Sequence, residues 1–239
     1  MAVGASPHPE PLTRTSPLHN TLVLFSGPTR DTMALFDRTT WAALSILRRH
    51  LGLWTALRVG INVERRVKAG DPFKALPPAT DDKERGSREQ LGPALVLFEV
   101  LCGRVSSDTA RTITAEVVEI GAHIFLRQSI GTLDRAHLST LDEAERRAYV
   151  EARMARFPNA DARIDFVEPD RVGFTVTSCR FVRLCREVGL PDLAPIFCAG
   201  DASYFGGIEP DVQLIRPQTL AAGGSCCPFE LRYDDASAP

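Results

Sequence analysis

The chain has 239 residues, 44% of them hydrophobic, a formal net charge of −2 and a pI near 6.2. This length and apolar content suffice for a buried core without disulfide or metal crosslinks. The basic residues are spread along the sequence instead of forming one run, which argues against a nucleic-acid partner.

No segment has the features of a targeting or membrane sequence. Residues 1–20 are rich in proline but lack an apolar core segment, and no run of 18 apolar residues occurs in the chain. We therefore expect a cytoplasmic protein without a membrane partner, in which the six cysteines are free thiols. Residues 1–20 are predicted to form a disordered arm.

Residues 21–158 are predicted to form a helical region. Five helices are predicted over about 31–51, 54–67, 87–101, 107–130 and 141–157. In the first and the fourth, apolar residues are separated by three and four positions, as on one face of a helix. Ser87, followed by Glu89, is the predicted cap of the third helix. The residues before it, 70–87, are rich in proline, glycine and charge and predict a long exposed connection.

After Asn159 the apolar residues alternate, which is typical of strands. Four strands are predicted around 164–166, 172–176, 212–216 and 229–233, with a hairpin connecting the first two. The fold class is therefore α+β: a helical layer and an antiparallel sheet of about four strands, with a helix inserted between the second and third. Residues 159–235 form this α+β region, expected to join the helical region in one compact domain.

Five of the six cysteines lie between residues 177 and 229. A helix capped by Thr177 or Ser178 would place Cys179 in its first turn, where backbone amides and nearby arginines favour a thiolate. Cys185 falls on the apolar stripe of the same helix and is interpreted as a packing residue.

Cys198 and Asp201 are three residues apart around a glycine, so both can face one cavity if the chain bends there. Asp201 then either moves a proton or caps the following turn. Arg216, at the end of a predicted strand, suits a bidentate grip on a carboxylate or a surface ion pair. His123 lies beside an apolar stripe of a predicted helix. It is either an interior residue with one hydrogen bond or a catalytic base.

Gly223 and Gly224 precede the last predicted strand, where they form either an anion-binding turn or a plain hairpin. The adjacent Cys226 and Cys227 point in opposite directions if extended, so at most one faces the site. There is no C-x-x-C pair and no histidine at ligand spacing. We therefore expect neither a metal nor another cofactor.

Over its last third the chain resembles the L-2-amino-thiazoline-4-carboxylic acid hydrolase family, through Val-Thr-Ser-Cys179, Cys198-x-x-Asp201 and Arg216-x-x-Thr219-Leu-Ala-x-Gly223-Gly224-x-x-Cys227. The resemblance implies a hydrolase that opens a small heterocycle by adding water to a ring carbon and breaking a carbon–sulfur or carbon–nitrogen bond. It implies catalytic roles for Cys198, Asp201, Cys179 and Cys227. The residues expected to contact substrate are Arg216, Thr219, Gly223, Gly224, Tyr204 and His123.

Members of that family usually continue with an Asp-Phe-Arg-like sequence after the last cysteine, whereas this chain has Pro228-Phe229-Glu230. We expect this departure to lie at the edge of the cavity, where it favours a divergence of this protein from the usual members of the family. It keeps open a non-catalytic small-ligand-binding or accessory role on the same fold, and thiol-based metal or redox sensing is a third interpretation. The expected partner is a small-molecule substrate from amino-acid-derived or secondary metabolism, and a homo-oligomer is left open.

Overall fold

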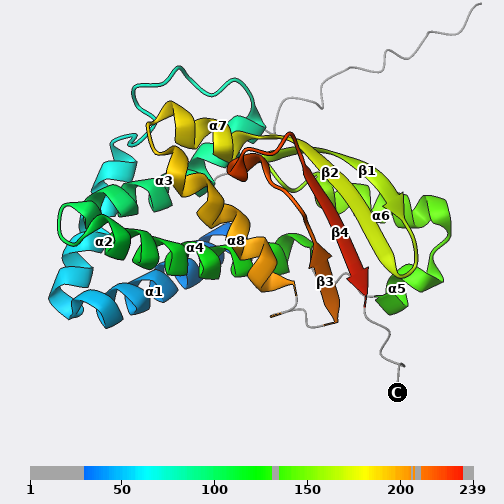
Figure 1. Ribbon diagram of the computed structural model, residues 1–239. Helices are drawn as coiled ribbons and strands as arrows, with labels where there is room; N and C mark the ends of the chain where they lie inside the picture. Colours follow the sequence, from blue (N-terminus) through cyan, green and yellow to red (C-terminus); the bar gives the residue numbers. More distant parts are fainter. Residues whose placement is uncertain (1–29, 131–134, 206, 208–210, 234–239) are drawn as a thin grey trace, which may run out of the picture.

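The computed structural model describes residues 30–130, 135–205, 207 and 211–233 (Figure 1). The predicted arm at 1–20 lies outside the described residues. The fold is α+β, as predicted. The described helices are α1 (Arg30–Leu51), α2 (Leu53–Lys68), α3 (Asp82–Cys102), α4 (Ser107–Ile130), α5 (Arg135–Thr140), α6 (Glu143–Met154), α7 (Arg180–Glu187) and α8 (Ala194–Tyr204).

The strands form one antiparallel sheet in the order β1-β2-β4-β3. Their bounds are β1 (Ala160–Val167), β2 (Arg171–Cys179), β3 (Val212–Ile215) and β4 (Cys227–Tyr233). The predicted hairpin joins β1 and β2, closed by a hydrogen bond from the Glu168 amide to the Arg171 carbonyl. Helices α7 and α8 are inserted between β2 and β3, which confirms the predicted insertion.

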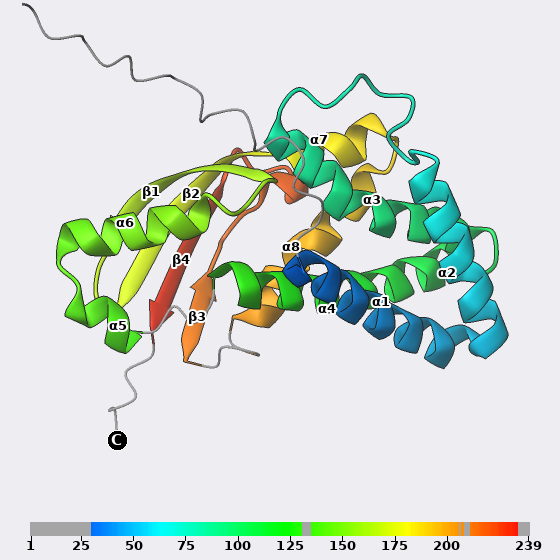
Figure 2. The ribbon, with the colours of Figure 1, turned by 180° about the vertical axis from the view of Figure 1, so that it is seen from behind.

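Two clusters of buried side chains form the core. One lies among the helices α1 to α4, α7 and the start of α8, and includes Leu95 and Leu184. The other lies between the sheet and the helices that cover it, and includes Val172 and Leu231. Figure 2 shows α6 lying across one face of the sheet. Helix α8 belongs to both clusters, because its first residues are buried among the helices and its last residue against the sheet.

The start of α3 differs from the prediction. The helix begins at Asp82 because the side chain of Asp81 accepts a hydrogen bond from the Glu84 amide (2.6 Å) and caps it. Ser87 is therefore inside the helix, where its hydroxyl donates to the Lys83 carbonyl. The residues from Asp82 to Ser87 belong to the first turns of α3. The predicted exposed connection over residues 70–87 is therefore wrong in its last six residues.

The start of α7 also differs. Strand β2 continues through Cys179, which is itself the residue that precedes α7. Thr177 and Ser178 are strand residues, and the Ser178 hydroxyl donates to the Asp161 carboxylate of β1 (2.7 Å). The prediction that one of them caps the helix and places Cys179 in its first turn is wrong, because the β1–β2 pairing extends further than the sequence pattern indicated.

None of the helices in the described ranges is long and apolar enough to cross a membrane.

Candidate active site

Helix α8 presents Cys198 and Asp201 together. They are three residues apart on the helix and therefore share a face, so the predicted chain bend is not needed. Asp201 lies in the last turn of α8, which excludes its alternative role as the cap of a following turn. Gly200 faces α4 so closely that an added Cβ would lie 2.5 Å from the Cβ of Ala122. The missing side chain lets α8 pack directly on α4.

Arg216 connects α8 to the sheet. One guanidinium nitrogen donates to the Asp201 carboxylate (2.8 Å), and the other donates to the backbone carbonyl of Cys198 (2.8 Å). The guanidinium also lies over the ring of Phe229 on β4, 4.9 Å from its centre. The Arg216 side chain is only 10% exposed. Both expected roles, a grip on a substrate carboxylate and a surface ion pair, need correction. Arg216 binds a carboxylate of its own protein, and it does so in a largely buried position.

Two further thiols, Cys179 and Cys227, lie within electrostatic range of Cys198. Their charge, like the charges of Asp201 and Arg216, contributes to the pKa of the Cys198 thiol. These residues come from the end of β2, from α8, from the segment after β3 and from the start of β4. We call them the thiol–carboxylate cluster. The structure thus brings together five residues that the sequence places up to 48 positions apart.

All three thiols of the cluster are protonated at neutral pH. Burial raises the pKa of Cys198 to about 12, and Asp201 adds to the shift while Arg216 opposes it. Burial also raises the pKa of Cys179 and of Cys227. The prediction of a thiolate at Cys179 is therefore wrong, because desolvation outweighs the backbone amides that oppose it. Cys185 is fully buried among the helices, as predicted for a packing residue.

The pKa of the Asp201 carboxyl group is also raised, but this brings it close to neutral pH instead of away from it. Burial raises its pKa to about 6, and the charge and hydrogen bond of Arg216 oppose the shift without cancelling it. The side chain keeps 27% of its surface exposed, so water reaches it. A carboxyl group that changes its charge near neutral pH and contacts water can take up or release a proton during a reaction.

The segment between β3 and β4 is a tight turn. Thr219 caps the short 3₁₀ helix η2 (Leu220–Ala222), and Gly223 has a φ of 90° that suits glycine. The Gly223 and Gly224 amides donate to the carbonyls of Leu220 (3.2 Å) and Thr219 (2.9 Å). Both amides are therefore engaged within the turn.

The same turn positions Cys227. The Leu220 amide donates to its sulfur (3.1 Å), so the turn holds this thiol at the start of β4. Cys227 is buried, whereas Cys226 is partly exposed and accepts a hydrogen bond from the Gln218 side chain (3.4 Å). The two adjacent thiols thus lie in different surroundings.

His123 lies on α4 next to the C-terminal half of α8. Its Nε2 is 2.7 Å from the Ser203 hydroxyl, and its ring centre lies 5.9 Å from that of Tyr204. Tyr204 is fully buried in the sheet-side core, where packing accounts for its position. Ser203 carries no sequence signal of its contact with His123, because the partner is 80 residues away.

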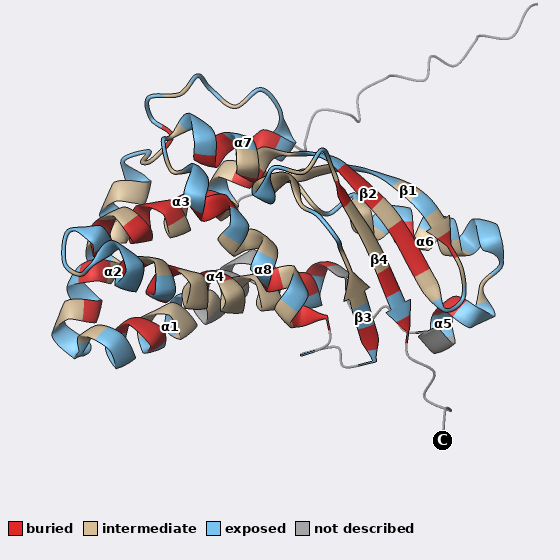
Figure 3. Ribbon diagram, viewed as in Figure 1, coloured by how far each residue is buried: buried red, intermediate tan, exposed pale blue. Residues whose placement is uncertain are grey.

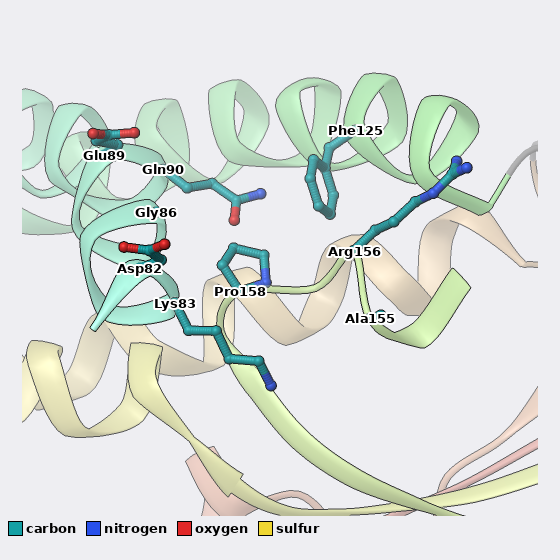
Figure 4. A pocket seen from close by; sticks show the side chains of 9 residues that line it. All are labelled: Asp82, Lys83, Gly86, Glu89, Gln90, Phe125, Ala155, Arg156 and Pro158. Atoms are coloured by element: carbon teal, nitrogen blue, oxygen red, sulfur yellow. The ribbon is translucent and has the colours of Figure 1, made fainter. Parts of the chain in front are cut away.

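A separate open groove of about 450 Å³ lies between α3, α4 and the connection from α6 to β1 (Figure 4). The side chains of Gln90 and Phe125 project into it toward Pro158. None of the predicted catalytic or substrate-binding residues lines this groove. Within the described ranges, no three His, Cys, Asp or Glu side chains come together in a way that could hold a metal ion.

The chain matches the model of the L-2-amino-thiazoline-4-carboxylic acid hydrolase family over residues 94–231, more than half of its length, and it belongs to that family. The matched region begins within α3, contains the whole thiol–carboxylate cluster and ends in β4. It reaches well beyond the last third of the chain, to which the resemblance in sequence was confined. No match to a curated protein was found.

Proposed function

We propose that the protein is a hydrolase that opens a small heterocycle resembling 2-aminothiazoline-4-carboxylate. Membership of the family supports a hydrolase. The observation that carries the proposal is the Asp201 carboxyl group, with a pKa of about 6, held between a buried arginine and a thiol and still accessible to water. This is the arrangement that general-base activation of water requires.

In the proposed reaction Asp201 takes a proton from a water molecule, whose oxygen attacks the ring carbon between sulfur and nitrogen. The new carbon–oxygen bond becomes a carbonyl as the carbon–sulfur bond breaks. The two protons of the water end on the ring nitrogen and on the released sulfur, so the product is an N-carbamoyl cysteine. Asp201 carries the first proton from the water to the ring nitrogen and ends in its starting form.

Arg216 and Cys198 have separate roles in this proposal. The hydrogen bonds of Arg216 to the Asp201 carboxylate and to the Cys198 carbonyl use two of the five N–H groups of the guanidinium, which leaves donors for a substrate carboxylate. Cys198, with a pKa of about 12, starts the reaction as a thiol. It therefore suits proton donation to the leaving sulfur better than nucleophilic attack, and it regains a proton from the new hydroxyl group as the carbonyl forms.

The experiment is to incubate the protein with L-2-aminothiazoline-4-carboxylate and to measure thiol release and the mass of the product. We expect Cys198→Ala to lower turnover about a hundredfold and Cys198→Ser to retain more activity, because a hydroxyl can still donate a proton. Unchanged turnover in Cys198→Ala would remove the role of this thiol. A covalent adduct trapped on Cys198 would replace the activated-water mechanism, and no ring opening of this or related heterocycles would contradict the proposed function.

The alternative, a non-catalytic binding protein, depended on the departure at Pro228 and Glu230. Alternation along β4 places both residues on the face opposite Phe229, whose ring lies under Arg216. The Glu230 carboxylate accepts a hydrogen bond from Arg232 (2.7 Å) on that opposite face. Pro228 directly follows Cys227, but both departing residues lie on the strand face away from Arg216, so the departure is a weak argument for the alternative.

A further inference from the structure

The outer face of α2 exposes an unusual amount of apolar surface. Trp54 is 75% exposed and Ile61 65%, and Leu53 and Leu57 on the same helix are also exposed. Figure 3 shows exposed stretches along α2. Trp41, on the adjacent α1, is 74% exposed, so both tryptophans of the protein are in contact with solvent. Large apolar side chains gathered on one surface mark interaction sites in soluble proteins. Helices α1 and α2 form the end of the molecule opposite the sheet (Figure 1).

The exposed residues of α2 are arranged symmetrically about Ile61. At helical spacing they form one face, which we call the α2 face: Trp54, Leu57, Arg58, Ile61, Glu64, Arg65 and Lys68. Arg58 and Glu64 lie three residues before and after Ile61. Trp54 and Lys68 lie seven residues before and after it. Each such pair joins two groups that attract one another.

We propose that the α2 face binds the α2 face of a second copy of this chain, with the two helices antiparallel and the two-fold axis at Ile61. In such a pair a residue n positions after Ile61 lies opposite the residue n positions before it on the other helix. Glu64 then meets the partner's Arg58, and Lys68 meets the partner's Trp54. The interface is the same patch on both copies, as two-fold symmetry requires.

The charges select this arrangement. Between Thr39 and Lys68 the chain carries six lysines and arginines but one acid, Glu64. A parallel pairing of the two helices would place Glu64 against Glu64 and Arg58 against Arg58, which repel. The antiparallel pairing matches the single acid with a cation on each side of the axis. Arg and Trp are also among the residues enriched in protein interfaces.

The single chain leaves these groups available. No ion pair of Arg58 is found in the described part of the chain, and Glu64 pairs only with its neighbour Lys68 at 2.6 Å. Both side chains of that pair are more than 60% exposed, so exchanging it for a contact with the partner's Arg58 costs little. Lys68, once released, can lie over the partner's Trp54 as a cation over an aromatic ring.

The test is a charge exchange measured by sedimentation over a concentration series of the full-length protein. We expect a dimer, and we expect Arg58→Glu and Glu64→Arg each to raise its dissociation constant about tenfold, because each turns two attractions into repulsions. The double variant, Arg58→Glu with Glu64→Arg, should restore dimerisation. The matched control is Arg104→Glu, a charge reversal at an exposed arginine outside the α2 face, which should change nothing. Dilution should also shift the tryptophan fluorescence to longer wavelength.

Three outcomes would overturn the proposal: a monomer at every concentration, a dimer that both single variants leave unchanged, or a double variant no better than the singles. Binding to phosphatidylglycerol vesicles provides a further arm, because an anionic lipid surface is the competing occupant of a basic, tryptophan-containing face. If vesicle binding is lost in Arg58→Glu, strengthened in Glu64→Arg and accompanied by no dimer, the face binds lipid instead of a second copy. All substituted positions are exposed, so thermal unfolding of the variants should match the wild type at dilutions where both are monomers.

Discussion

The junction of α3 with α7 and the junction of α8 with β3 each hold a carboxyl group beside arginine side chains, with opposite results. Glu84, at the first junction, accepts hydrogen bonds from Thr80 and Arg88 and pairs with Arg183, and these contacts lower its pKa to about 2 although burial opposes them. Asp201, at the second, has one arginine, and burial raises its pKa to about 6. The Glu84 side chain is less exposed (4%) than that of Asp201 (27%), yet only the pKa of Glu84 is lowered, so the number of donors decides the direction of the shift.

Asp161 on β1 extends the comparison. Its carboxylate accepts hydrogen bonds from Ser178, Lys83 and Arg180, which together lower its pKa to about 2. Like Glu84, it connects several elements of the fold and stays charged. An acid with all its acceptor positions filled holds a structure together, whereas an acid with too few donors keeps a proton within reach at neutral pH. The number of hydrogen-bond donors therefore separates the structural acids Glu84 and Asp161 from the candidate catalytic acid Asp201.

The sharpest way to break the comparison is to neutralise one acid of each kind. Asp201→Asn should lower kcat/KM at least a hundredfold, because the amide cannot accept the proton of water, while Arg216 keeps an acceptor and the fold persists. Asp161→Asn should leave kcat/KM within about threefold and lower the free energy of unfolding by about 1 kcal/mol, a modest effect because this side chain is nearly half exposed. Steady-state kinetics and urea unfolding of both variants decide it, and equal losses of activity would erase the distinction.

Glu84→Gln should lower the free energy of unfolding by about 2–3 kcal/mol, from the shift of its pKa from 4.5 to about 2. Since the folded state lowers this pKa, the stabilisation is present above about pH 4.5 and is lost as the pH falls toward 2. The difference between wild type and variant in urea unfolding should therefore shrink over that range. A difference that stays constant with pH would mean that the charge of Glu84 is not its source.

The pH dependence of the rate should reveal Asp201. With a pKa of about 6 the base form increases about tenfold between pH 5 and 7, and kcat/KM should rise with it and then level off. The contribution of Asp201 to the free energy of unfolding has the opposite pH dependence. Because folding raises its pKa, protonated Asp201 stabilises the folded state fully below pH 3.8, and this stabilisation is lost as the pH rises through 6. A rate profile that is flat in wild type from pH 5 to 7 would contradict the assignment of the base.

The smallest effect is expected on the outer face of β4. Glu230→Arg should change kcat/KM less than twofold, because Glu230 faces away from Arg216 and contacts Arg232 and Arg171. Phe229→Ala is the matched neighbour: it removes the ring under Arg216 and should lower kcat/KM about tenfold. Similar losses in the two variants would show that the alternation of the strand does not separate them.

Local patterns predicted the elements of the fold well. The four-and-three spacing of Ile113, Val117, Ile120 and Ile124 located α4, and the alternation after Asn159 located β1, β2 and β4, with residues 212–216 as a fourth candidate that became β3. The start of α3 was placed five residues late, because Ser87 and Asp81 are both good caps and only the packing of the first turn chooses between them.

The candidate site was harder to predict because its properties arise from contacts between elements. The pairing of Asp201 with Arg216 joins residues 15 positions apart on different elements, and no periodicity encodes it. The raised pKa of Cys179 follows from burial under neighbouring elements, whereas the sequence shows only the nearby arginines and helix start. The residue types of the cluster were predictable, but their protonation states were not.

Helix α8 begins in one core and ends in the other, and Asp201 lies one turn before its end. Asp201 therefore lies where the helical cluster and the sheet-side cluster meet. Its distance from Arg216 depends on how these two parts of the molecule pack against each other. A relative that exchanged either half for a different one would have to rebuild the acid–arginine spacing before it could hydrolyse anything.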